Sequence, residues 1–161
     1  MAPPEQPVQH VALLAGNPSK GHPVREVVPG RRRGDGHWEL LGTPALVPGC
    51  AAGDVLAVQE DDGRFEVQFR GGNLGVVSYV PEGRDVTSAI ESLVVRFHPL
   101  GGSVEVPGDS RFVVITVPVL VGFPAVEAEM ERWQSETGLD WYFSNVYDEQ
   151  DQQLGWWDDA G

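Results

Sequence analysis

Short runs of apolar or alternating residues, separated by turn residues, fill the first half of the chain. Five such runs cover residues 8–14, 24–28, 37–41, 55–59 and 64–69. Residues 60–63 join the last two runs and end in Asp-Gly, a pair that tolerates the positive φ angles of a tight hairpin. Because no helical period appears among these runs, the pattern predicts a small antiparallel β-barrel or a strongly curled sheet. Residues 29–36 are expected to form an exposed loop.

A helical period appears after residue 73. The first predicted helix has its apolar stripe at Ile90, Leu93, Val94 and Phe97. Ser88 and Glu91 have capping-box spacing at its start, and Pro99 with two following glycines ends it. The second predicted helix opens with Pro124 and finishes at Gly138. Its apolar stripe is formed by Val126, Met130 and Trp133.

Apolar strands flank both predicted helices. They cover residues 74–80, 103–106, 111–117 and 139–146. The resulting order, β-α-β-β-α-β, is a split βαβ unit, which is typical of a ferredoxin-like sandwich with one antiparallel sheet under two helices.

These patterns predict a chain in four parts. They are a disordered lead-in at residues 1–7, a β-rich subdomain at 8–72, a ferredoxin-like subdomain at 73–147 and an acidic aromatic tail at 148–161. Neither central part has many more than about 80 residues, so each core would be marginal alone. We therefore expect one α+β unit in which the β-barrel-like N-terminal subdomain packs on the C-terminal βαββαβ sandwich.

The charge of the chain restricts its partners. Eleven Lys and Arg against 24 Asp and Glu give a formal net charge of -13, and residues 123–161 hold one basic and ten acidic side chains. Nucleic acids and anionic membranes take most of their protein affinity from Lys and Arg, so neither is an expected partner. The chain lacks the cationic and apolar regions of a secretory signal, and no apolar run approaches about 18 residues. A cytoplasmic location is expected.

Two short motifs resemble a known family. Residues 38–44 read Trp-Glu-Leu-Leu-Gly-Thr-Pro, and residues 53–58 read Gly-Asp-Val-Leu-Ala-Val ahead of the Asp-Gly hairpin. With the split βαβ half, they resemble the small bacterial proteins of domain of unknown function 4265 over most of residues 8–147. The chain departs from this pattern at residues 26–29, where Glu-Val-Val-Pro lacks the expected aromatic residue. The resemblance implies the architecture, and the family label implies no activity.

The spacing of histidine and cysteine gives little support to metal or nucleophile chemistry. The candidates are scattered at His10, His22, His37, Cys50 and His98. No pair has HxH, HExxH or CxxC spacing, so we expect no metal and no cofactor. Cys50 follows Pro-Gly in a turn and is expected to be an unreactive, small apolar residue. The triplet Arg31-Arg32-Arg33 either clamps an anion or keeps a loop soluble.

The C-terminal segment combines aromatic with acidic residues. The candidate partner-binding residues are Trp141, Tyr147, Asp148, Glu149, Asp151, Trp156, Trp157, Asp158 and Asp159. Aromatic anchors rimmed by carboxylates suit a basic protein partner. The leading hypothesis is a non-catalytic protein-binding module, in the manner of a toxin-neutralising immunity protein or an acidic adaptor. Alternatively, Trp156 and Trp157 fold back and cover the sheet of the chain itself.

A second hypothesis is a small enzyme or small-molecule-binding domain with a pocket between the two subdomains. Its candidate residues are His37, Asp54 and His98, with Arg96 available for an anion. Asp54 also has a structural explanation, because a side chain that follows Gly53 in a turn can accept backbone N–H bonds. Binding is favoured over catalysis because no residue spacing requires a catalytic group.

Overall fold

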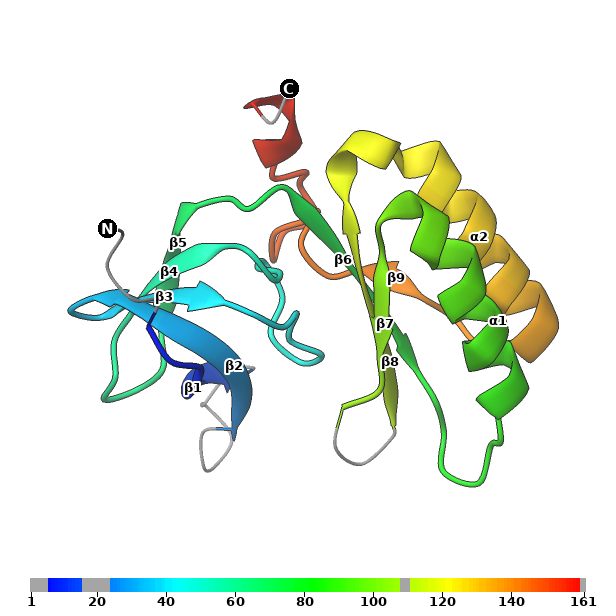
Figure 1. The fold of residues 1–161 in the computed structure, drawn as a ribbon, viewed down its shortest axis with the longest axis horizontal. Coiled ribbons are helices and arrows are strands. Elements are labelled where there is room, and N and C mark those ends of the chain that lie inside the picture. Colours follow the sequence, from blue (N-terminus) through cyan, green and yellow to red (C-terminus); the bar gives the residue numbers. More distant parts are fainter. Residues whose placement is uncertain (1–5, 16–23, 108–110, 160–161) are drawn as a thin grey trace.

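The fold contains two antiparallel β-sheets and two α-helices (Figure 1). The computed structural model describes residues 6–15, 24–107 and 111–159. The first sheet comprises β1 (Gln9–Ala15), β2 (Val24–Gly34), β3 (His37–Leu40), β4 (Val55–Val58) and β5 (Phe65–Phe69). The second comprises β6 (Asn73–Tyr79), β7 (Ser103–Glu105), β8 (Phe112–Pro118) and β9 (Tyr142–Phe143). The helices are α1 (Thr87–Phe97) and α2 (Phe123–Thr137), with short 3-10 turns η2 (His98–Leu100), η3 (Val119–Val121) and η4 (Trp156–Asp159).

The first sheet curls around its own core without closing. Its strands follow the order β1-β2-β3-β4-β5, so that β1 and β5 form its two edges. Alternate side chains point inward, among them Leu13, Trp38 and Leu56. The two edges approach at one end, where Leu14 N donates to Gly63 O at 2.9 Å. This contact does not extend into a β-ladder, so the predicted barrel is an open, curled sheet.

The arginine-rich segment belongs to a strand, and its prediction as a loop is wrong. β2 continues through the whole triplet and pairs with β3. The Arg32 guanidinium lies 4.9 Å from the centre of the Trp38 ring and 3.0 Å from the Glu60 carboxylate. Arg33 forms an ion pair with Glu39. Partners on β3 and in the turn after β4 thus hold the segment extended, a stabilisation that single-sequence turn signals do not reveal.

The second sheet has the strand order β7-β8-β6-β9, and both helices cover the same face of it (Figure 1). The core between sheet and helices includes Leu74, Val76, Phe97, Ile115, Met130 and Trp133. Val77 and Val114 are direct partners in the sheet and are buried on its opposite face. The central strands β6 and β8 are therefore covered on both faces.

The helices match their predicted positions but differ in detail. α2 has Pro124 in its first turn and ends at Gly138, whose φ of 74° is the left-handed conformation that favours glycine. The predicted capping box at α1 does not form, because α1 begins at Thr87 and Asp85 Oδ1 accepts the Thr87 N–H at 3.1 Å. Val94 is 45 % exposed, so it lies outside the buried stripe of α1.

The last strand, predicted over residues 139–146, is reduced to the two residues of β9. Ser144 N still donates to Gly75 O at 2.9 Å. At the next position the Asn145 side chain takes over the pairing: Oδ1 accepts the Gly75 N–H and Nδ2 donates to Asn73 O. A side chain therefore satisfies the β6 backbone where a strand is predicted.

Hydrogen bonds join the two sheets. Gly49 N donates to Ser144 O at 2.8 Å, and the Thr43 and Thr116 hydroxyls lie 2.6 Å apart. Gly75 permits the close approach, because a Cβ at this position would lie 2.4 Å from Ser144 Oγ. The connection between β3 and β4 thus packs on the face of the second sheet that the helices leave uncovered. Within the described residues, no helix is both long and apolar enough to cross a membrane.

Candidate functional site: the acidic aromatic face

A continuous chain of aromatic rings lies at one end of the second sheet. Its members are Trp141, Phe143, Phe123, Trp157 and Trp156, in that order. Neighbouring ring centres are 5.3 to 5.6 Å apart, and each pair meets edge to face. This arrangement is the one that the aromatic quadrupole favours. All five side chains are half-buried, so each packs on the core and also presents part of its ring to solvent.

Trp156 fastens the C-terminal segment to the rest of the molecule. Its Nε1 donates to Asn145 O at 2.8 Å. The Arg70 guanidinium, which follows β5, lies 5.5 Å from the centre of the Trp156 ring. Trp156 and Trp157 both pack on the chain's own core and both keep some exposed surface. They therefore cover the core in part, as the second alternative predicts, and still leave part of each ring open to a partner.

The carboxylates lie on the loop that leads from β9 to η4 and in η4 itself. Asp148 organises this loop: its Oδ1 accepts the N–H groups of Gln150 at 2.8 Å and Gln152 at 2.9 Å. Asp151 occupies a left-handed conformation with φ of 58°. Glu149, Asp151 and Asp158 are exposed, and none forms an ion pair with a described residue. Within the described part of the chain, no ion pair therefore offsets the charge of these carboxylates.

We call this combined surface the acidic aromatic face. It comprises Phe123, Trp141, Phe143, Tyr147, Asp148, Glu149, Asp151, Trp156, Trp157 and Asp158. Tyr147 is 45 % exposed. The Asp159 side chain lies outside the described part of the structure. Sequence reasoning missed Phe123 and Arg70, because no local pattern signals a contact with Trp157 or Trp156 so far along the chain.

Asp54 is a structural carboxylate at the junction of the two sheets. It is 1 % exposed and accepts the N–H groups of Ala51 at 3.0 Å and Gly71 at 2.8 Å. Arg70 Nη1 lies 3.5 Å from its Oδ2. Burial raises the pKa of Asp54, and the two N–H donors and Arg70 oppose that rise. Since the protein's own groups occupy both carboxylate oxygens, Asp54 has its bonding needs met internally.

The three candidate catalytic residues are not brought together. Asp54 is buried at the junction, His37 lies on β3, and His98 is exposed in η2 after α1. They form no hydrogen bond or ion pair with one another. The fourth candidate, Arg96, bridges the helices through its Nε, which lies 2.6 Å from Glu129 Oε2. These positions do not combine into a site.

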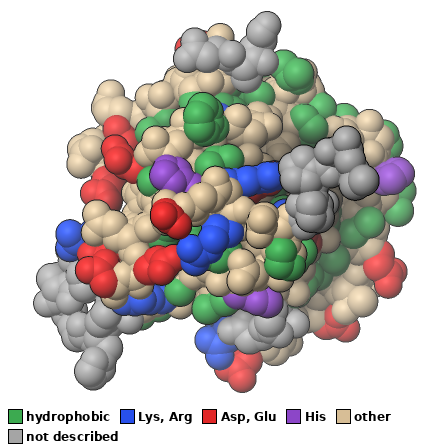
Figure 2. All heavy atoms as spheres, turned by 60° about the vertical axis from the view of Figure 1, so that its left-hand side comes forward, with side chains coloured by type: hydrophobic (Ala, Val, Ile, Leu, Met, Phe, Trp, Pro, Cys, Tyr) green, Lys and Arg blue, Asp and Glu red, His purple; other side chains and the backbone are tan. Residues whose placement is uncertain are grey.

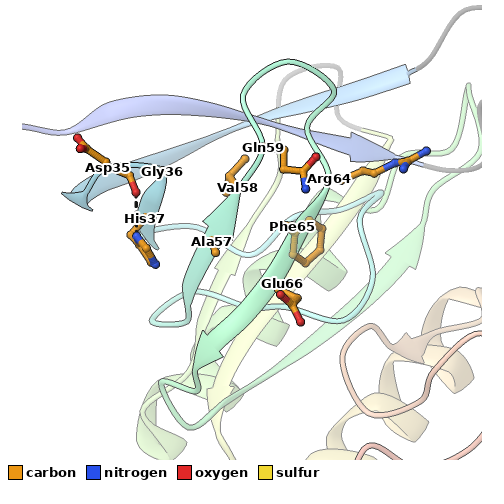
Figure 3. A pocket seen from close by; sticks show the side chains of 9 residues that line it. All are labelled: Asp35, Gly36, His37, Ala57, Val58, Gln59, Arg64, Phe65 and Glu66. Carbon is orange, nitrogen blue, oxygen red and sulfur yellow. Dashed lines mark hydrogen bonds between the residues drawn. The ribbon is translucent and has the colours of Figure 1, made fainter.

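His37 lines an open hollow on the outer face of the first sheet (Figure 3). The hollow has a volume of about 400 Å³ and includes Ala57 on β4 and Glu66 on β5, which are neighbours of His37 in one cross-strand row. His37 Nδ1 lies 2.9 Å from Asp35 O, a contact that orients the ring. Neither Asp54 nor His98 lines this hollow.

Charged side chains of both signs are interspersed over the face that carries the first sheet (Figure 2). Within the described residues, no group of three or more His, Cys, Asp or Glu is arranged to hold a metal ion. His22 lies outside those residues. Cys50 is fully buried, and this burial, with Asp54 nearby, raises the pKa of its thiol well above the ordinary value.

Comparison with known proteins gives a family and a fold. The family model described as "Domain of unknown function (DUF4265)" matches residues 26–141. A solved structure, described as "Novel crystal structure of a hypothetical protein from Neisseria gonorrhoeae", is similar with a TM-score of 0.63 and 13 % identity. The likeness covers 89 % of this chain and 96 % of that one, and it concerns the fold. The search of curated proteins finds no match.

Proposed function

Because this chain belongs to the family described as domain of unknown function DUF4265, whose description assigns no activity, we propose a function from the geometry. We propose that the protein is a non-catalytic binding module that docks a basic protein on its acidic aromatic face. One observation carries the proposal: half-buried rings that keep some exposed surface form a continuous row beside carboxylates that no described cation neutralises.

The aromatic row supplies the anchoring part of such an interface. Large rings lose little conformational entropy on binding and dominate the energy of protein interfaces. Here their own edge-to-face contacts already hold the rings in place. A partner therefore meets preorganised anchors, which reduces the entropic cost of association.

The carboxylates supply attraction and selectivity. Residues 123–161 contain ten acidic and one basic side chain, and this imbalance falls mainly on α2, on the loop before η4 and on η4 itself. A surface of this sign speeds encounter with a basic partner and disfavours acidic ones. This combination suits a neutraliser of a basic toxin or an acidic adaptor. In the same proposal, the βαββαβ part serves as a ferredoxin-like platform for the face, and residues 148–161 act as a functional tail.

A salt-dependent capture experiment with charge-reversed variants tests the proposal. The tagged chain is used to recover partners from cells that produce it naturally, and the affinity of the purified partner is then measured by calorimetry. The double variant Glu149→Lys/Asp158→Lys should bind about tenfold more weakly or worse. Both side chains are exposed and form no ion pair with any residue that the structure describes, so the fold should remain intact.

The matched control is Glu82→Lys/Glu105→Lys, which changes the net charge equally at exposed positions outside the face. It should keep most of the affinity. Trp157→Ala should also weaken binding, because it removes one ring of the acidic aromatic face. The indole of Trp157 makes ring contacts but no side-chain hydrogen bond within the described residues, so the change breaks no such bond. A partner that binds all variants equally, or whose binding ignores salt, would show that another surface is used.

A further inference from the structure

β5 presents unpaired backbone groups at an open edge of the first sheet. Gln59 N donates to Arg64 O at 2.8 Å, which fixes one rung between β4 and β5. Rungs of an antiparallel pair recur at every second residue, so the next falls at Glu66. The N–H and C=O groups of Phe65 and Val67 therefore point away from β4. Within the described residues, no backbone hydrogen bond outside the sheet reaches them.

This edge lacks most of the features that keep sheet edges apart. Natural edges are guarded by proline, lysine, short length or a bulge. β5 has five residues without Pro or Lys, and its register shift falls only at the end, between Val67 and Phe69. The second sheet, in contrast, ends in β7 with three residues and β9 with two. β5 is thus longer than either edge strand of the second sheet, and it leads into the acidic aromatic face.

One side chain of β5, Glu66, favours a basic residue on a partner strand. His37, Ala57 and Glu66 form one cross-strand row along the hollow seen in Figure 3. A strand added to β5 continues this row and places its own side chain beside the exposed Glu66. Opposite charge is favourable at such a position, so Lys or Arg is preferred there. Phe69 is 72 % exposed and offers an apolar contact at the end of the edge.

The edge leads directly to the acidic aromatic face. Arg70 follows β5 immediately, and its guanidinium lies 5.5 Å from the centre of the Trp156 ring. The connection from β5 to β6 runs past the C-terminal turn (Figure 1). An extended segment that pairs with β5 and passes Phe69 therefore reaches the Trp156 region.

We infer that β5 is a docking edge, on which an extended segment of the basic partner adds as an additional strand with Lys or Arg beside Glu66. The inference rests on the proposed function for the charge of the partner, and it adds the mode of recognition. Main-chain hydrogen bonds to Phe65 and Val67 supply affinity, and the charge of alternate side chains supplies selectivity.

Peptide titration of the labelled full chain tests this inference. The probe is the peptide acetyl-Thr-Lys-Val-Lys-Val-Lys-Thr-amide, followed by amide NMR spectra. Saturable downfield shifts are expected at the Phe65 and Val67 amide protons, because both gain hydrogen bonds, and a smaller shift is expected at Glu66. Glu66→Lys should weaken binding about fivefold, whereas the matched edge variant Glu105→Lys on β7 should not.

A second peptide, methylated on every backbone nitrogen, keeps its charge but has no backbone N–H to donate and cannot pair as a strand. If it shifts the β5 amides equally, or if Glu105→Lys weakens binding as much as Glu66→Lys, the inference is overturned. Shifts confined to the acidic aromatic face would overturn the edge mode and leave the proposed function standing. Saturable binding nowhere would overturn the inference, whereas the proposed function is tested by the charge-reversed variants. Pairing of β5 with a second copy, detected by light scattering, would show that the strand added to this edge comes from another copy of this chain and would also overturn the inference.

Discussion

At the scale of single residues, Asp54 is a carboxylic acid buried at the junction of the two sheets, where it accepts the N–H groups of Ala51 and Gly71. The folded-state pKa of Asp54 is raised above its ordinary value of 3.8, chiefly by burial. The folded chain therefore holds this proton more tightly than the unfolded chain. Its contribution to stability is greatest below pH 3.8 and falls as the pH rises through the folded-state pKa.

Replacing this carboxylate should destabilise the fold. Asp54→Ala leaves the Ala51 and Gly71 N–H groups without their acceptor, so we expect the free energy of unfolding to fall by about 2 kcal/mol. Urea unfolding at several pH values measures this loss, which should shrink as the pH rises above 3.8. Glu131→Ala, on the exposed side of α2, should change little. A loss that grows with pH would contradict the raised pKa.

At the scale of elements, η4 is held by ring contacts, by the hydrogen bond of Trp156 and by the stacked Arg70 guanidinium. Trp156→Phe keeps a ring beside Arg70 but removes the N–H that Asn145 O accepts. We expect the free energy of unfolding to fall by about 1 kcal/mol. Trp157→Phe removes no such bond and serves as the control. Equal effects of the two changes in urea unfolding would mean that packing alone holds the tail.

Elements whose stability is local are predicted well from the sequence. α2 has its apolar stripe, its Pro124 and its terminal Gly138 within one short segment, and its predicted and observed positions agree. β2 and β9 are not predicted well, because distant partners decide their lengths. Arg32 stays in a strand through Trp38 and Glu60, and β9 ends early because Asn145 takes over its pairing.

The candidate site also has one part that the sequence predicts and one part that depends on distant contacts. Its aromatic and acidic composition is visible in the sequence, whereas its ring order is not. Phe123 and Arg70 join Trp157 and Trp156 only when α2 and β5 are placed in space. The proposed catalytic set failed to assemble because proximity to predicted core elements says little about the direction or neighbours of a polar side chain.

At the scale of the whole molecule, the net charge of -13 opposes compactness. Raising the salt concentration from about 0.01 M to about 0.15 M should screen this repulsion. We expect the Tm, measured by circular dichroism, to rise by about 2–4 °C. Salt also weakens the attraction in exposed ion pairs such as Arg32–Glu60, but this loss should be smaller than the gain from screening the repulsion among the excess negative charges. The Glu149→Lys/Asp158→Lys variant, with less net charge, should gain less. A fall in Tm with salt would show that ion pairs dominate.

Asn145 has a consequence for how the molecule is made. Among the described residues, one edge of β6 is completed by β9 and by this side chain, which follows Gly75 by 70 positions. During synthesis, the amides and carbonyls of that edge therefore stay unpaired until residues 142–145 have left the ribosome. Chains that stop before β9 therefore expose an unpaired edge on β6, and they are the forms most prone to aggregate.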